Sequence, residues 1–284
     1  MRTIRLPNVE TGAGVQRFAT PRALVSVGLL WLTLCFILPV VYLLVESLNF
    51  GDGAMFEHYA RVFSTENPIY LIILGRTLWY ALLVTVITLT LGYVMAYVIA
   101  FRAKRPIMWL AFVLLPLWVA IIIRFYGVQL FFVPTGPVQQ VFDTDFNLYR
   151  SQYGVFLGLV SALLPFAVLP IYNSLRSIDE EVIDAASILG ATPFQRLRTV
   201  VFPLSLSGVI AATLFVYILA AGSYLAPSML GGPANTMMAL QIVEVRSNSL
   251  PMAAALSVVF TVVLMVLIGL FNYFTNISEV LGEI

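Results

Sequence analysis

Four aromatic side chains are the residues of this sequence best suited to hold an organic cation. Such a cation is attracted to the face of an aromatic ring by about 0.5–2 kcal/mol for each contact. The candidates lie within or near apolar segments: Trp118, Tyr126, Tyr217 and Tyr224. Aromatic residues near the ends of membrane spans more often anchor the chain at the interface. Because Trp118 and Tyr217 lie deeper in their segments, we expect these two to contribute most.

Arg124 is the most informative charged residue, because it lies near the outer end of an apolar segment. It can act as a gate or as a contact for a solute-binding protein, or it can extend to the membrane surface as many interfacial arginines do. Three carboxylates in expected external loops either attract a cation or are simply solvated: Asp143, Asp145 and Glu244. From the aromatic residues and this arginine we predict a binding path lined by Trp118, Arg124, Tyr217 and Tyr224.

The residue types that catalysis requires are scarce in this chain. His58 is its single histidine and Cys35 its single cysteine. We expect His58 to be a solvated loop residue and Cys35 a small buried hydrophobe, which leaves no zinc site, Ser/His/Asp grouping or disulfide framework. No GxxxxGK[ST] motif is present to hold a nucleotide. We predict no catalytic residue, metal site or cofactor in this chain.

The composition indicates an integral membrane protein. Of the 284 residues, 61% are hydrophobic and 10% charged, against roughly 45–50% and about 25% in soluble domains. Six apolar segments are long enough to span a bilayer: residues 23–45, 78–101, 107–133, 155–172, 204–225 and 252–274. We predict an all-α domain of six transmembrane helices over 23–275, with tails at 1–22 and 276–284. The near absence of charge in the spans argues against a proton- or sodium-driven carrier.

Lysine and arginine are distributed unequally between the two sides of these spans. If the N-terminus is cytosolic, ten basic residues are cytosolic: Arg2, Arg5, Arg17, Arg22, Arg102, Lys104, Arg105, Arg176, Arg196 and Arg198. Five are external: Arg61, Arg76, Arg124, Arg150 and Arg246. Since basic residues concentrate in cytosolic loops, we predict that both termini and residues 177–203 face the cytosol.

Residues 177–203 carry strong helix signals between two apolar segments. Ser177 with Glu180 forms one expected capping box, and Thr192 with Gln195, followed by Pro193 at the first helical position, forms another. Gly190 stands where a glycine commonly ends a helix. The segment predicts two short helices at an angle. It is either a partly helical connection or a docking surface, and its length and two caps favour docking.

The same segment resembles the EAA loop of ABC importer permeases. That family pattern is Glu-Ala-Ala, three residues, Gly, nine residues, and Ile-x-Leu-Pro. The matching residues here are Asp184, Ala185, Ala186, Gly190, Val200, Phe202 and Pro203. Asp for Glu, and Val and Phe for the two aliphatic residues, are the departures. In the family this loop inserts into a cleft of a cytoplasmic ATPase, so the resemblance implies an ATPase-coupling role for Asp184, Ala185, Ala186, Gly190 and Pro203.

Further short motifs resemble the spermidine/putrescine branch of type I ABC importer permeases across residues 24–275. They include His58-Tyr59, Leu115-Pro116-x-Trp118, Leu164-Pro165-Phe166 and Ala226-Pro227-x-x-Leu230-Gly231-Gly232. The resemblance implies a non-enzymatic permease subunit of a bacterial inner membrane that imports a polyamine or related amine. Aminoethylphosphonate, an opine, thiamine or a metal ion are alternative solutes, and an unpowered channel or secondary carrier is the alternative mechanism.

The resemblance also implies partners. They are a second, homologous permease subunit, two copies of an ATP-binding subunit that hold ATP and Mg²⁺, and a periplasmic or lipid-anchored binding protein. Membrane lipids surround the assembly, and no nucleic acid is expected.

Overall fold

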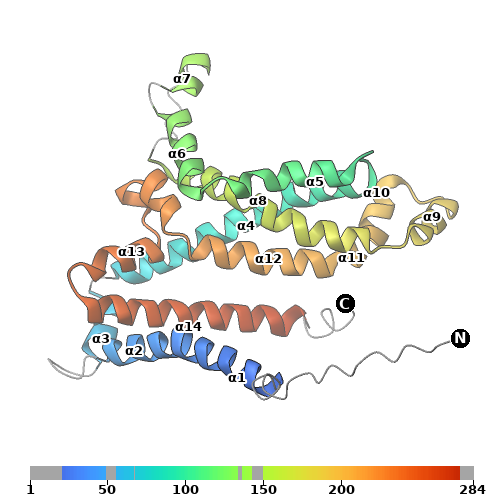
Figure 1. Cartoon of the computed structure of the whole chain (residues 1–284). Coiled ribbons are helices and arrows are strands. Elements are labelled where there is room, and N and C mark those ends of the chain that lie inside the picture. Colours follow the sequence, from blue (N-terminus) through green and yellow to red (C-terminus); the bar gives the residue numbers. More distant parts are fainter. Residues whose placement is uncertain (1–20, 49–55, 67, 134–135, 143–149, 276–284) are drawn as a thin grey trace, which may run out of the picture.

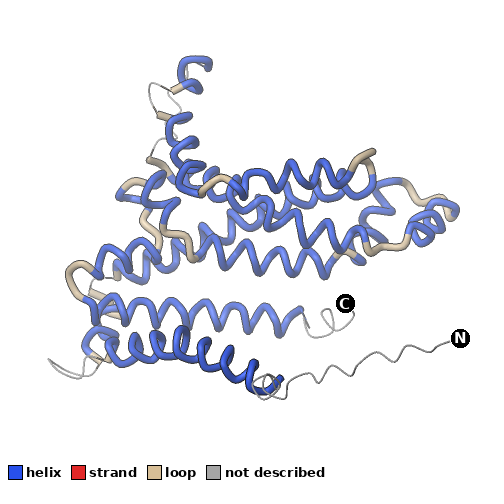
Figure 2. The backbone as a smooth tube through the Cα atoms, in the orientation of Figure 1, coloured by secondary structure: helices blue, strands red, loops and turns tan. Residues whose placement is uncertain are grey.

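The computed structural model describes residues 21–48, 56–66, 68–133, 136–142 and 150–275, and within them the chain is helical with short connections and no strand (Figures 1 and 2). The expected tails at 1–22 and 276–284 lie almost entirely outside these residues, as do Asp143 and Asp145. The prediction of an all-α membrane protein is confirmed. Four helices are long and apolar enough to cross a membrane, and the number rises to six if each of two bent pairs is one span.

The four long spans are nearly continuous helices. The first consists of α1 (Pro21–Leu32), the π-helical turn η1 (Thr33–Ile37) and α2 (Leu38–Ser47), and the others are α4 (Ile69–Phe101), α8 (Gln152–Arg176) and α14 (Leu250–Thr275). The 33 residues of α4 measure about 50 Å at 1.5 Å per residue. A bilayer core is only about 30 Å thick, so α4 is longer than a span requires. It begins at Ile69, well before Leu78, where the apolar pattern placed the start of the span.

The third span is sharply bent. Helix α5 (Pro106–Leu114) and the 3-10 turn η2 (Leu115–Trp118) meet α6 (Ile121–Phe132) at 91°. Pro116 provides no backbone N–H to continue the α-helix, and the two residues after Trp118 are extended. The span predicted over residues 107–133 is therefore not straight, because α6 and α7 (Pro137–Phe142) leave the bundle almost at a right angle (Figure 1).

The fifth span is bent as well. The helical path α10 (Pro193–Arg196), η3 (Leu197–Val201) and α11 (Phe202–Leu204) meets α12 (Leu206–Ala221) at 67°. The turn occurs at Ser205, whose hydroxyl accepts or donates a 3.1 Å hydrogen bond with Tyr93 of α4. Pro203 therefore lies inside the helical path rather than at its end.

Helices α4, α8 and α12 form the packed core (Figure 1). Small residues let their backbones approach closely, as is common between membrane helices. A Cβ at Gly92 of α4 would lie 2.8 Å from the Cβ of Ala167, and one at Gly208 of α12 would lie 2.5 Å from the Pro170 carbonyl oxygen of α8. A 3.0 Å hydrogen bond joins the hydroxyls of Ser174 and Ser207 beside the second contact.

Helix α14 and the first span form a second layer beside this core (Figure 1). Helix α14 packs mainly on α2 and on the unpredicted helix α13 (Met238–Arg246), and contacts α12 only lightly. An apolar cleft of about 500 Å³ therefore separates α14 from α4 and α12. The remaining connection between α12 and α13 contains η4 (Pro227–Gly231) and η5 (Pro233–Asn235).

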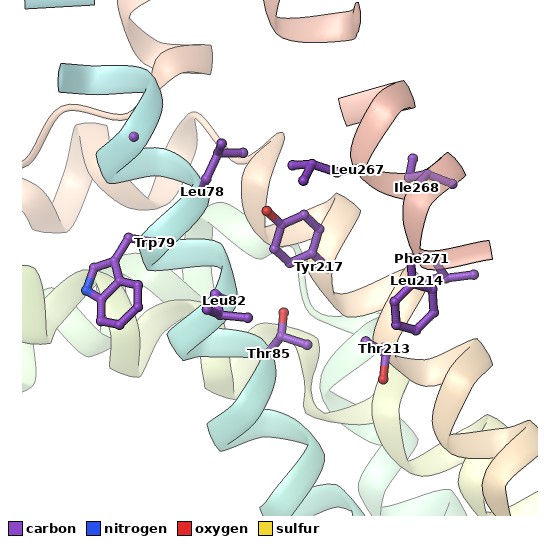
Figure 3. A pocket seen from close by; sticks show the side chains of 11 residues that line it. Leu78, Trp79, Leu82, Thr85, Thr213, Leu214, Tyr217, Leu267, Ile268 and Phe271 are labelled. Atoms are coloured by element: carbon purple, nitrogen blue, oxygen red, sulfur yellow. The ribbon is translucent and has the colours of Figure 1, made fainter. Parts of the chain in front are cut away.

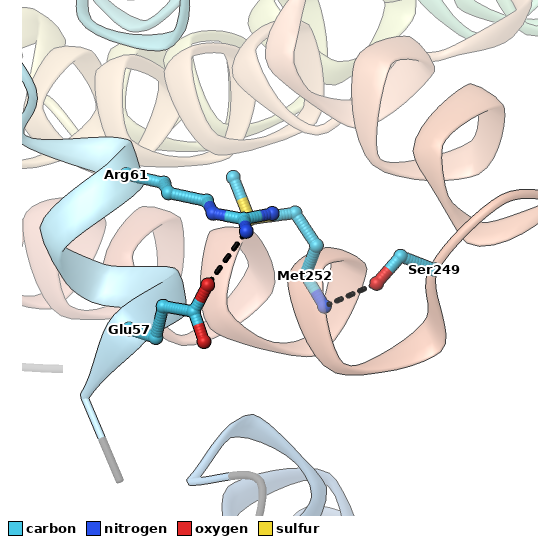
Figure 4. A network of polar contacts seen from close by, with 4 residues as sticks. All are labelled: Glu57, Arg61, Ser249 and Met252. Atoms are coloured by element: carbon cyan, nitrogen blue, oxygen red, sulfur yellow. Dashed lines mark hydrogen bonds and ion pairs between the residues drawn. The ribbon is translucent and has the colours of Figure 1, made fainter. Parts of the chain in front are cut away.

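The N-terminal end of α14 and helix α3 (Glu57–Val62) lie side by side (Figure 4). Arg61 pairs with Glu57 at 2.6 Å, and the Ser249 hydroxyl accepts a 3.3 Å hydrogen bond from the Met252 N–H at the start of α14. Helix α3 contains Tyr59, whose hydroxyl forms a 2.8 Å hydrogen bond with the Ser47 hydroxyl at the end of α2. The expectation that His58 is solvated was wrong, because His58 is only 8% exposed and α3 packs its inner face against α14.

Candidate functional site

The segment 177–203 forms the two helices that its caps predict. Helix α9 (Glu180–Ile188) begins at Asp179, whose carboxylate accepts a 3.1 Å hydrogen bond from the Glu181 N–H. The predicted capping role of Ser177 was wrong, because its hydroxyl instead donates to the Ser174 carbonyl at the end of α8. Asp179, nearer the helix, accepts one of its free N–H groups, and Glu180 and Glu181 add negative charge to the first turn.

Gly190 ends α9 in the left-handed conformation, with φ of +82°. Its N–H donates to the Ser187 carbonyl at 3.0 Å, and the Ala191 N–H donates to the Ala186 carbonyl at 3.1 Å. A Cβ here would meet nothing within 4 Å, so the position requires glycine for its backbone conformation and not for space.

The second helix starts as predicted. Thr192 and Gln195 form a complete capping box, with hydrogen bonds of 3.3 and 2.8 Å, and Pro193 occupies the first helical position. The Arg196 guanidinium donates a 2.6 Å hydrogen bond to the Ser187 hydroxyl of α9. This bond fixes the two short helices against each other, so the segment projects from the bundle as an ordered unit (Figure 1).

The tip of this projection is apolar, which the sequence reading missed. Ile188, Leu189 and Phe194 are 86%, 87% and 71% exposed. Asp184 and Ala185 are exposed beside them, Ala186 is half-buried, and Pro203 is exposed where the path returns to the bundle. The run Ser187-Ile188-Leu189-Gly190 contained the signal, since apolar residues at a helix end with no neighbour to pack on mark a contact surface.

Two of the predicted path residues meet in one cavity. Arg124 of α6 and Tyr224, which follows α12, line a cavity of about 390 Å³ between the bent third span, α8 and the end of α12. Its other lining residues are Leu117, Ile121, Leu159, Ala162, Leu163, Phe166, Leu219, Gly222, Ser223 and Leu225. The 91° turn places α6 across this cavity, with Phe125 fully buried beneath it.

Trp118 and Tyr217 lie outside this cavity. The Trp118 side chain is 91% exposed at the bend of the third span. Tyr217 lines the apolar cleft between the core and α14, together with Thr85, Thr213 and aliphatic side chains (Figure 3). The four predicted path residues are therefore distributed over three places in this chain.

A third cavity, of about 490 Å³, lies between the first turns of α4, helix α13 and Arg150, which precedes α8. It contains Glu244 and two arginines that the sequence reading treated only as external charges, Arg76 and Arg150. Arg76 donates to the Ala234 carbonyl. The single proton of the Tyr80 hydroxyl is shared between the side-chain oxygens of Gln152 and Asn235, at 3.2 and 3.1 Å. Polar contacts thus order this end of the bundle.

The described residues contain no cluster of metal ligands. No group of three histidine, cysteine, aspartate or glutamate side chains could hold a metal ion there. Cys35 is exposed on the first span, which contradicts the expectation that it is buried.

Comparisons with known proteins agree with this fold. Residues 88–278 match the family of binding-protein-dependent transport system inner membrane components. The chain is 31% identical to the spermidine/putrescine transport system permease protein PotB of Salmonella typhimurium, over 82% of this chain and 86% of that protein. It is 30% identical to PotB of Escherichia coli, over 82% of this chain and 90% of that protein.

Two solved ABC transporters have a similar fold. A bacterial transporter that imports the acidic polysaccharide alginate has a chain with a TM-score of 0.80 and 15% identity, covering 92% of this chain and 96% of that one. A chain of the MetNI methionine ABC transporter has a TM-score of 0.53 and 20% identity, covering 75% of this chain and 98% of that one. At these identities the likeness concerns the fold, which is that of type I ABC importer permeases.

Proposed function

Because this chain belongs to the family of binding-protein-dependent transport system inner membrane components, we propose that it moves a polyamine or related organic amine into the cytosol, driven by ATP. Family membership makes it a permease subunit of an ABC importer. The identity of the solute, the energy source and the partners are our inferences. The spermidine/putrescine names of its relatives support the solute class.

The exposed apolar tip of residues 177–203 is the observation that carries the ATP-driven mechanism. Ile188, Leu189 and Phe194 project on a capped and hydrogen-bonded unit, and such a surface requires a protein partner to cover it. We infer that the partner is a cytoplasmic ATP-binding subunit that holds ATP and Mg²⁺. Asp184, Ala185, Ala186, Gly190 and Pro203 position the contact, and closure of two ATPase subunits moves the membrane helices.

The interior supports weak binding of a cation. The cleft beside α14 contains Tyr217 and the cavity beside Arg124 contains Tyr224, and no described carboxylate lines either of these two. Ring faces attract an amine without the cost of burying a carboxylate. We infer that Trp118 and Arg124 complete the path. Both lie near the bend of the third span, which faces the second permease in this proposal. Aminoethylphosphonate, opines, thiamine and metal ions remain the alternatives that the solute test must separate.

The surrounding assembly follows from this role. A periplasmic or lipid-anchored binding protein delivers the solute; the alginate transporter of similar fold was solved in complex with a periplasmic protein. A second permease completes the pore. The start of α1, the end of α14 and the α9–α10 projection lie toward one end of the bundle (Figure 1). This arrangement supports a multi-pass inner membrane protein with both termini cytosolic.

The solute assignment predicts that cells with the complete transporter take up labelled putrescine or spermidine in preference to a neutral solute and a phosphonate. A P-loop ATPase should co-purify with the tagged chain in mild detergent. Uptake of the phosphonate or neutral solute alone would reject the polyamine assignment. Uptake without a bound ATPase would favour an unpowered channel or carrier.

The path assignment predicts that Tyr224→Ala lowers putrescine uptake by roughly 2- to 30-fold, which corresponds to the loss of one cation–π contact. Tyr224→Phe should retain most of the uptake, because the ring remains. Tyr42→Ala is the matched control, since Tyr42 on α2 lines neither interior cavity. Equal uptake by the Ala and Phe variants would show that the ring does not contact the solute.

The topology predicts one-sided labelling of a cysteine at position 195. In a Cys35→Ala background, Gln195→Cys should react with an impermeant maleimide in inside-out vesicles and not in intact cells. Gln195 is exposed next to the Thr192 cap. Labelling of intact cells would reverse the orientation.

A further inference from the structure

Among the described residues, the Arg124 guanidinium lacks hydrogen-bond acceptors for two of its nitrogen atoms. Its Nε and Nη1 atoms are buried from solvent and have no hydrogen-bond partner. Arginine stays charged under physiological conditions and carries five N–H donors in a planar fork. Such donors are costly to bury without an acceptor, and a carboxylate is the acceptor that best matches their geometry. The position therefore calls for an acceptor that this arrangement lacks.

The described part of the chain does not provide that acceptor. The side chains that share the cavity with Arg124 are apolar except for Ser223 and Tyr224. The described carboxylates lie elsewhere, at the ends of the helices and in the cytosolic projection: Glu46, Glu57, Glu66, Asp179, Glu180, Glu181, Asp184 and Glu244. The one ion pair among described residues joins Glu57 and Arg61 on α3.

The solute of the proposed function cannot supply the acceptor either. Protonated amines only donate hydrogen bonds, and their charge repels a guanidinium. A cavity of about 390 Å³ is large enough for a side chain from a neighbouring protein. Since neither the described residues nor the cargo offers an anionic acceptor, a neighbouring protein of the assembly is the source that this cavity favours.

The surface around Arg124 points to a protein neighbour. Helix α6 leaves the bundle at 91° and exposes Ile122, Ile123, Tyr126 and Leu130 by 54%, 64%, 55% and 55%. Phe125 anchors its inner face with no exposure. A lone apolar helix that extends sideways from a bundle buries these residues most effectively against another set of helices.

We propose that an acidic side chain of a second permease subunit enters this cavity and pairs with Arg124. The proposal rests on the proposed function, because it needs a second permease beside the bend of the third span. The ion pair lies at the outer bend, next to Tyr224, where it joins the two subunits and keeps the guanidinium away from the cationic solute.

The test uses the complete transporter with a tag on this chain. A photo-crosslinking residue in place of Ile121, which lines the same cavity, should form an adduct with a segment of the second permease that contains Asp or Glu. Arg124→Glu should reduce both recovery of the second permease and putrescine uptake by at least about tenfold, as for a truncated buried charge pair. Changing the adducted acid to Arg in that variant should restore both.

The controls separate this proposal from the function on which it rests. Arg61→Glu makes the same exchange at an exposed external pair and should leave recovery unchanged. An adduct within the same chain, with a phospholipid or with a segment that has no acid would overturn the proposal, as would unchanged recovery of Arg124→Glu. Arg124→Gln removes the charge that an anionic solute would need. If this variant gains no phosphonate uptake and recovers less of the second permease, the acceptor is the protein partner. Absence of a second permease from the unsubstituted complex would refute the proposed function itself.

Discussion

Leu189→Asp should abolish solute uptake while the chain still inserts into the membrane. Leu189 is 87% exposed at the end of α9, beside Ile188 and across the Gly190 turn from Phe194. A carboxylate in an apolar contact loses its hydration without gaining a partner. Replacement of a central contact residue commonly costs 2 kcal/mol or more, which is about a 30-fold loss of affinity for the ATPase. Recovery of the ATPase with the tagged chain and putrescine uptake measure the two effects.

Two controls make this result specific to the projection. Leu189→Met keeps an apolar side chain and should retain both the ATPase and uptake. Phe63→Asp places the same charge on a 56% exposed apolar residue after α3, at the opposite end of the bundle, and should leave ATPase recovery intact. Normal recovery of the ATPase by Leu189→Asp would mean that the tip is not the docking surface.

The local structure of this projection could be predicted from sequence because its determinants are local. Thr192, Gln195 and Pro193 specify a helix start within one turn, and Gly190 specifies a helix end. The one local error, Ser177, arose where two cap residues compete: Asp179 lies closer to the first turn and accepts its N–H. The exposed tip was missed because hydropathy alone does not distinguish apolar residues that face the membrane from those that face a partner.

The arrangement of the spans could not be predicted in the same way. Pro116 and Pro203 lie near the two bends, but the angles of 91° and 67° depend on the helices against which α6 and α12 pack. The separation of α14 from α12 likewise has no local signature, since every face of a membrane helix is apolar.

The candidate path shows the same limit. Arg124 and Tyr224 share a cavity only because α6 turns across α8. Depth along a span suggested Trp118 and Tyr217 instead, yet depth carries no information about which face of the helix a residue occupies. Trp118 is consequently exposed at the bend, and Tyr217 lines the cleft beside α14.

Gly208→Ala should destabilise the folded chain, although alanine is the better helix former. A Cβ at this position would lie 2.5 Å from both the Pro170 carbonyl oxygen and the Ser174 Cβ, and 3.1 Å from the Ile171 Cα. Because two of these three atoms belong to the α8 backbone, the helices must separate. Overpacking of this kind costs about 1–3 kcal/mol, which exceeds the roughly 1 kcal/mol that alanine gains over glycine in a helix.

Gly269→Ala is the matched control, because a Cβ there meets nothing within 4 Å. The same exchange in α14 should therefore leave the thermal midpoint of the detergent-solubilised chain unchanged or raise it, whereas Gly208→Ala should lower it and Gly208→Val should lower it further. Separation at Gly208 would also break the 3.0 Å hydrogen bond between Ser174 and Ser207. Equal midpoints for the two alanine variants would mean that α8 and α12 do not pack at this distance, and the core contact that aligns the cavity beside Arg124 would have to be revised.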